Sequence, residues 1–381
     1  MSERRLRSRM AALGVPGEEE ARERAWAVAS RAFERRSPAR PRRLRPVIAL
    51  VLALGVGGAA LAPPGQAVRH WVADVVGSDE RVSPLGTLPA PGRLLVVSPA
   101  GPWVVNRDGE RRRLGDFTDA SWSPRGLFVA ATRRYSLSAV EPDGDVRWSI
   151  DRIGPVRAPR WSSDGFRIAY LSGGSLRVVA GDGTGDRRLA GAVGPVAAAW
   201  RPGAGHVLAY VGGAGEVRVV DADSGRTLWR LPPRPHVAGL DWLPDGRRLV
   251  VLSPERLAIV DARTRARRDM TLPSGARQTA ATFAVAGEGL VVIVSRGDTS
   301  ELLLVRPGRS RRLFRASGTF SSLALSPDGR FVAVAWPDTD QWLFVPVARG
   351  ARPRAVSGVA GRFESGGRRG RPDLRGWCCP P

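Results

Sequence analysis

Side chains that could do acid–base or metal chemistry are few among the 381 residues of this sequence. The three histidines, His70, His206 and His236, lie far apart and lack the spacing of metal ligands. No Gly-x-Ser-x-Gly turn is present to carry a nucleophilic serine. Most carboxylates of the central region stand in turn sequences such as Pro-Asp-Gly, where they hydrogen-bond to nearby backbone. We therefore expect no catalytic residue, no metal ligand and no cofactor, and a protein that is not an enzyme.

The two cysteines, Cys378 and Cys379, are adjacent and close to the C-terminus. They could form a vicinal disulfide, pair with a second chain or remain free, and we favour a structural link in the tail. The segment Val219–Leu231, VVDADSGRTLWRL, resembles the repeat of pyrroloquinoline-quinone dehydrogenases, which place an adjacent cysteine pair against the cofactor. Only one repeat carries the pattern well, and no calcium-ligand set accompanies it. A quinoprotein dehydrogenase is therefore a remote alternative.

A short turn motif, of which WLPDG and LSPDG are examples, recurs through the chain behind an apolar anchor residue. Successive anchors lie 39 to 42 residues apart. A period near forty with strand-like content is typical of a β-propeller in which each repeat forms one four-stranded blade. The anchors are Trp122, Trp161, Trp200, Trp242, Phe283 and Leu325.

Within each repeat the anchor and turn are followed by two apolar runs, such as RIAYL and LRVV. These runs are continuous rather than alternating, as expected for strands covered on both faces by neighbouring blades. Each repeat then ends in an arginine-bearing segment such as RRLA, which protects an outer strand from pairing with other chains. We interpret the anchors as core residues that wedge between blades.

The ring must close without leaving a strand edge open. Residues 93–114 match the second, third and fourth strands of a blade whose first strand is missing. The segment Val359–Phe363, VAGRF, is a spare apolar strand candidate that would supply it. We therefore predict an all-β propeller of about seven four-stranded blades, with six blades as the alternative.

The sequences WSSDGFRIAY and LSPDGRFVAV resemble the repeats of TolB-type and WD-like propellers of bacterial envelopes. The resemblance covers about residues 93–365, and the Gly-His and Trp-Asp pairs of eukaryotic WD repeats are absent. A basic segment, one span and a propeller together resemble a group of actinobacterial membrane proteins. The resemblance implies an envelope role through protein or wall contacts and transfers no catalytic residue.

The N-terminal region predicts a membrane anchor. Residues 1–45 hold 13 arginines against 6 acids, and the 17 residues from Pro46 to Ala62 carry no charge. As a helix they span about 25 Å, short but workable for a bacterial membrane, and the arginines place the N-terminus in the cytoplasm. A cleaved signal peptide is the rival interpretation, which the long leading segment and Pro63 argue against. We therefore expect a single-pass membrane protein with an extracytoplasmic propeller.

Residues 18–36 predict an amphipathic helix with Trp26, Ala29 and Phe33 on its apolar stripe. This helix would rest on the membrane or bind a cytoplasmic partner. The main hypothesis is a protein- or ligand-binding scaffold in the envelope; the alternative is an anti-sigma-like transmembrane regulator whose propeller is the sensor. Nucleic-acid binding is not expected, because all 59 basic residues are arginine, as a GC-rich genome produces, and they are interleaved with acids.

The expected organisation has five parts. They are a basic cytoplasmic segment (1–45, with the helix at 18–36), a transmembrane helix (46–62), a linker (63–92), the propeller (93–366) and a C-terminal tail (367–381).

Overall fold

The computed structural model describes residues 86–379 except 204, 235, 255, 271–276, 287–288 and 307, and it describes only the backbone of residues 277–286. The amphipathic helix expected at 18–36, with Trp26, Ala29 and Phe33, and the membrane span expected at 46–62 lie outside this part. Within it, no helix is long and apolar enough to cross a membrane.

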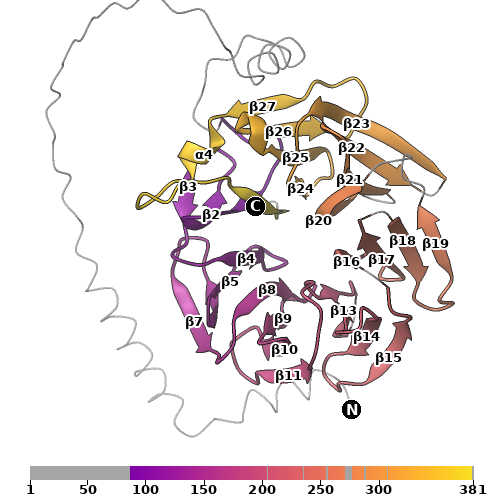
Figure 1. Cartoon of the computed structure of the whole chain (residues 1–381). Helices are drawn as coiled ribbons and strands as arrows, with labels where there is room; N and C mark the ends of the chain where they lie inside the picture. Colours follow the sequence, from indigo (N-terminus) through magenta and orange to yellow (C-terminus); the bar gives the residue numbers. More distant parts are fainter. Residues whose placement is uncertain are drawn as a thin grey trace, which may run out of the picture. The chain divides into compact units, whose positions relative to one another are not determined.

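Seven four-stranded antiparallel sheets are arranged as blades around a common centre (Figure 1). In blades 2 to 7 the four strands follow one another in sequence, from the innermost strand to the outermost. The prediction of an all-β propeller with seven blades is confirmed, and the six-bladed alternative is wrong.

Blades 1 to 3 contain, from the inside outward, the following strands. Blade 1 has β28 (Asp373–Cys378), β1 (Arg93–Ser98), β2 (Gly101–Val105) and β3 (Arg111–Arg113). Blade 2 has β4 (Asp119–Trp122), β5 (Val129–Arg133), β6 (Ser136–Val140) and β7 (Val146–Asp151). Blade 3 has β8 (Val156–Trp161), β9 (Arg167–Ser172), β10 (Ser175–Ala180) and β11 (Arg187–Ala190).

Blades 4 to 7 follow the same plan. Blade 4 has β12 (Ala199–Trp200), β13 (Val207–Val211), β14 (Val217–Asp221) and β15 (Thr227–Leu231). Blade 5 has β16 (Gly239–Trp242), β17 (Arg248–Ser253), β18 (Arg256–Asp261) and β19 (Arg267–Met270). Blade 6 has β20 (Arg277–Ala286), β21 (Gly289–Arg296), β22 (Thr299–Arg306) and β23 (Arg309–Ser317). Blade 7 has β24 (Leu323–Leu325), β25 (Phe331–Trp336), β26 (Gln341–Pro346) and β27 (Arg354–Ser357).

The recurring turn motif joins the first two strands of a blade through side-chain hydrogen bonds. In blade 3 the Ser162 hydroxyl accepts a hydrogen bond from the backbone N–H of Arg167, and Asp164 accepts one from the N–H of Phe166. The same pair of bonds recurs in blade 7, from Ser326 and Asp328. In these two blades, short polar side chains thus hold the turn that sets the register of the inner strand pair.

The anchor residues lie on the innermost strands. Trp200 donates from Nε1 to the carbonyl oxygen of Arg160 in blade 3, at 2.9 Å. Trp242 donates likewise to Ala199 in blade 4, at 3.2 Å. Each indole is thereby tied to the preceding blade. The strand positions of the anchors are the last residue of β4 (Trp122), β8 (Trp161), β12 (Trp200), β16 (Trp242) and β24 (Leu325), and the interior of β20 (Phe283).

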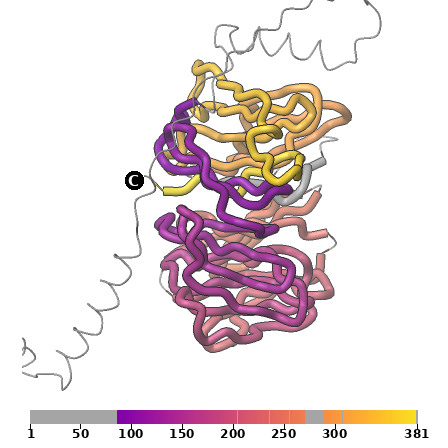
Figure 2. Tube along the Cα trace, turned by 90° about the vertical axis from the view of Figure 1, so that its left-hand side faces the viewer, coloured from indigo at the N-terminus to yellow at the C-terminus, as the bar shows by residue number. Residues whose placement is uncertain are grey.

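The two ends of the propeller sequence close the ring within blade 1. Strand β28 pairs antiparallel with β1, with Trp377 opposite Leu94. Both views show this C-terminal segment, in yellow, beside the N-terminal strands, in indigo (Figure 1 and Figure 2). Closure by both chain ends therefore agrees with expectation, but the closing strand lies in the segment 367–381 that was expected to be a tail.

The strand expected at Val359–Phe363 is wrong. Helix α4 (Val359–Arg362) occupies this segment, after Gly358 in the left-handed region at φ 69°. Val359 and Phe363 are buried, and the Phe363 ring lies 5.8 Å from that of Trp103 and 5.0 Å from that of Trp342. The segment fills the space between blades 1 and 7 with its side chains instead of pairing its backbone.

Candidate functional site

The two faces of the propeller differ in which connections they carry. Because strands alternate in direction, the connections from first to second and from third to fourth strand lie at one end of every blade. We call this end the turn face and the opposite end the loop face.

A groove of about 570 Å³ lies on the turn face between blades 1 and 2. Blade 1 contributes the start of β1 and the β2–β3 turn, and blade 2 contributes its two turns. We call it the blade 1–2 groove. Its lining residues are Arg93, Asn106, Glu110, Arg112, Gly126, Leu127, Phe128, Glu141, Pro142 and Asp143.

The charges of the blade 1–2 groove are mixed and largely held in place. The Arg93 guanidinium donates to the carbonyl oxygen of Gly126 at 2.7 Å and lies 5.2 Å from the centroid of the Trp122 ring. Burial lowers the pKa of Arg93. Arg112 donates to the carbonyl oxygen of Asp143 at 2.9 Å. A groove of this kind suits a polar chain segment with charges of both signs.

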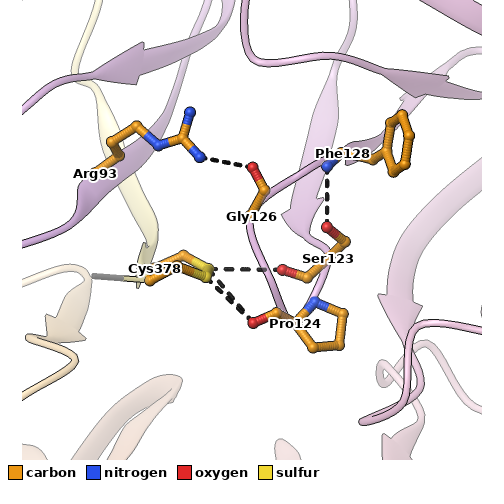
Figure 3. Close-up of a disulfide and its surroundings, with 7 residues drawn as sticks. Arg93, Ser123, Pro124, Gly126, Phe128 and Cys378 are labelled. Atoms are coloured by element: carbon orange, nitrogen blue, oxygen red, sulfur yellow. Dashed lines mark hydrogen bonds between the residues drawn. A yellow bond between two sulfur atoms is a disulfide. The ribbon is translucent and has the colours of Figure 1, made fainter. Parts of the chain in front are cut away.

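A disulfide joins Cys378 and Cys379 beside this groove (Figure 3). The Cys378 sulfur lies 3.6 Å from the carbonyl oxygen of Ser123, and the Cys379 sulfur lies 3.2 Å from that of Pro124. Of the three states left open by the sequence, the vicinal disulfide is therefore the one present. It sits at the end of the closing strand and packs on the first turn of blade 2.

Two exposed apolar side chains lie on the first turns of neighbouring blades, and one of them, Leu127, lines the groove. Leu127 and Phe166 are 60% and 66% exposed, and each follows the glycine of the first turn in its blade, blades 2 and 3 respectively. The same position is Arg247 in blade 5 and Arg330 in blade 7. The turn face therefore changes from basic to apolar at two neighbouring blades.

His206 takes the equivalent position in blade 4 and links two blades. Its Nε2 lies 2.8 Å from Asp164 Oδ2, and its Nδ1 pairs with Asp223, which also accepts from Arg167. Partial burial alone would raise the pKa of Asp164 and of Asp223. Hydrogen bonds outweigh this effect, from Ser162 to Asp164 and from His206 to Asp223, so the pKa of each carboxyl is lowered. With both ring nitrogens engaged, His206 serves as a link rather than as a base.

The other histidines add no chemistry to the site. His236 lies exposed on a connection of the loop face with a left-handed backbone at φ 57°, and His70 lies outside the described residues. Among the residues that the structure describes, no three His, Cys, Asp or Glu side chains are grouped to hold a metal ion.

Charged side chains of the innermost strands meet near the centre of the ring. Arg375 approaches Asp119 at 3.6 Å, and Arg160 interacts with both Asp119 and Asp241. Burial raises the pKa of Asp241 to about 6, against the opposing effects of a backbone hydrogen bond from Trp242 and the charge of Arg160.

This central group was not predicted from the sequence. A visible signal existed, because each of these residues stands one to three positions before a tryptophan of an inner strand. A β-bulge with Ala158 at φ 55° precedes Arg160, and the Ala158 N–H donates to Asp119 at 3.0 Å. Bulges of this kind redirect side chains.

No protein-family model matches the chain, and no curated protein matches its sequence. Solved structures do resemble it. Hsv2 of Kluyveromyces lactis is 12% identical, with 70% of this chain and 94% of that chain covered and a TM-score of 0.51. The β-propeller domain of Cps50 (Swd1) from Myceliophteria thermophila is 18% identical, with 65% and 87% covered and a TM-score of 0.49. Hydrazine synthase of Kuenenia stuttgartiensis is 12% identical, with 60% and 75% covered and a TM-score of 0.47. At 12% identity the likeness to Hsv2 shows the fold alone, a β-propeller.

Proposed function

We propose that this chain is a non-enzymatic scaffold that binds a protein partner on the turn face at blades 1 to 3. The observation that carries the proposal is the exposure of Leu127, which lines the blade 1–2 groove, and of Phe166 at the equivalent turn position of blade 3. Exposed apolar patches rimmed by polar residues mark interaction sites. Apolar side chains that become buried when the partner binds contribute most of the binding energy. The groove would take a polar segment of the same partner.

The scaffold is held at a bacterial membrane with the propeller outside the cytoplasm. The charge-free run 46–62 after an arginine-rich segment supports this proposal. The Cys378–Cys379 disulfide also supports it, since disulfides persist in oxidising compartments. A reporter fused after Pro381 should be active only if it depends on export; activity of a cytoplasmic reporter there would overturn this topology.

A regulatory role is the second candidate, favoured by the apolar stripe Trp26, Ala29 and Phe33 in the N-terminal segment. In that role the segment binds a cytoplasmic regulator while the propeller senses an external partner. Deletion of residues 1–36 separates the two candidates. Altered target-gene expression would support the regulator, whereas unchanged expression with retained envelope partners would support the scaffold.

The scaffold itself is tested by crosslinking capture of the full-length chain from its native membrane, followed by mass spectrometry. The double variant Leu127→Asp/Phe166→Asp should lose the partner. Tyr135→Asp is the matched control, because Tyr135 is an exposed aromatic residue, 42% exposed, on the loop face of blade 2. Equal capture by the double variant and the wild type would contradict the proposed surface.

A further inference from the structure

A second pocket, of about 370 Å³, lies beside blade 5 and is lined by basic residues. Arg234 and His236 come from the connection between β15 and β16, Arg256 begins β18, and Arg267 begins β19. No acidic residue lines the pocket among the residues that the structure describes. Three cationic side chains from three segments therefore converge on one cavity, apart from the blade 1–2 groove.

The positive charges of this pocket are only partly balanced. Arg267 donates from Nε to Asp269 at 2.6 Å. Arg234 and Arg256 form no ion pair with an acidic side chain in the described part of the chain. Burial lowers the pKa of Arg234, and the charges of Arg267 and Arg256 lower it further, while Asp269 opposes them. Among the described residues, Asp269 offsets one of the three guanidiniums, and those of Arg234 and Arg256 have no acidic partner.

We propose that this pocket binds a doubly charged oxyanion of the phosphate type. A phosphate monoester carries about −1.5 to −2 charge near neutral pH, which suits the guanidiniums of Arg234 and Arg256, for which the described residues supply no acidic partner. Guanidinium forks hold such oxygens through paired, charge-assisted hydrogen bonds. The Arg234 backbone N–H donates to the carbonyl oxygen of Gly215 at 3.1 Å, which fixes the connection that presents the side chain.

Isothermal titration calorimetry of the full-length chain at low ionic strength tests the proposal with two probes, inorganic phosphate and glycerol 3-phosphate. We expect saturable binding of at least one. Tighter binding of glycerol 3-phosphate would identify a phosphate ester as the ligand, and tighter binding of inorganic phosphate would identify the free ion. Absence of saturable binding of both would overturn the proposal.

Variants assign the binding to the pocket. Arg234→Gln and Arg256→Gln should each weaken binding about tenfold, since each removes a charge-assisted contact. Asp269→Asn should tighten it several-fold by freeing Arg267. Arg247→Gln, on the turn face of the same blade, removes the same charge outside the pocket and should leave affinity unchanged. An equal loss in Arg247→Gln would indicate attraction by net charge alone and would overturn the proposal.

Two further measurements keep the result interpretable. Glu255, which precedes Arg256 in the sequence, lies outside the described residues. Glu255→Gln should bind the anion as well as the wild type or better, and weaker binding would contradict the assignment. Melting curves of all variants establish that they are folded. If Arg234→Gln unfolds, the variants Arg256→Gln and Asp269→Asn test the proposal instead, because both of these residues are exposed.

Discussion

The Arg93 guanidinium donates a hydrogen bond to the carbonyl oxygen of Gly126, 2.7 Å away, across the boundary between blades 1 and 2. Arg93 also lies opposite Cys378 in the β1–β28 pair. One residue therefore connects the N-terminal strand, the closing C-terminal strand and the first turn of blade 2. The start of β1, which lines the blade 1–2 groove, is thus joined to both neighbouring segments.

Ring closure depends on the buried side chains of β28. Trp377 is 7% exposed, and its ring lies 5.7 Å from that of Phe344 in blade 7. Trp377→Ala should destabilise the protein by about 3–5 kcal/mol and lower the melting temperature by roughly 10 °C. Thermal unfolding followed by circular dichroism measures this, with the exposed Leu127→Ala as the control. An unchanged melting temperature would show that β28 does not close the ring.

Crowding at the first turn of blade 2 is tested by two equivalent glycines. A Cβ at Gly126 (φ 64°) would lie 3.0 Å from Arg93 Nη2 and 3.1 Å from Cys379 Sγ, whereas one at Gly329 (φ 69°) would meet nothing within 4 Å. Gly329→Ala should cost about 1 kcal/mol from its backbone conformation, and Gly126→Ala about 1–3 kcal/mol more from overpacking. Chemical denaturation measures both costs, and equal values would contradict the packing of the disulfide on this turn.

The vicinal disulfide should add little to global stability. A disulfide stabilises mainly by shortening the loop of the unfolded chain, and adjacent residues enclose no such loop. Cys378→Ser/Cys379→Ser should therefore change the melting temperature by less than about 2 °C. Alkylation with mass spectrometry should find free thiols in the wild type only after reduction. A loss as large as that of Trp377→Ala would contradict this view.

Stability should depend on pH through Asp241. The pKa of Asp241 is raised in the folded protein from 3.8 to about 6, so the native state binds a proton more tightly than the unfolded chain. Its stabilising contribution is complete below about pH 4 and is lost as the pH rises through about 6. Between pH 4 and pH 7.5 the wild type should lose about 2 kcal/mol relative to Asp241→Asn. Urea unfolding of both proteins across this range checks the sign, and parallel pH profiles would refute it.

The blade count was predictable because the turn chemistry is local. The turn after an anchor is built within a few residues, as at Ser162 and Arg167, so the spacing of the anchors reports the repeat directly. The closing strand was not predictable in this way, because the segments 359–363 and 373–378 are both short and neither carries the turn motif. What distinguishes the two segments is the burial of Phe363 between the rings of Trp103 and Trp342. That contact joins three distant parts of the chain.

The candidate sites were less predictable than the fold. Leu127 and Phe166 are ordinary apolar residues in the sequence, and only their exposure after the turn makes them candidates for binding. The basic pocket beside blade 5 joins Arg234, Arg256 and Arg267, which are three among 59 arginines in the chain. Composition could not separate these three from arginines that only solvate the surface.

Site-specific photocrosslinking in native membranes tests whether the turn face at blades 2 and 3 binds a protein partner. A photoreactive residue is placed at 127 or 166 on the turn face, or at 135 on the loop face as the control. We predict one shared protein adduct from positions 127 and 166 and none of it from 135. The adduct from position 127 should disappear when Phe166→Asp is added. No adduct from the turn face, or the same adduct from all three positions, would contradict the proposed binding surface.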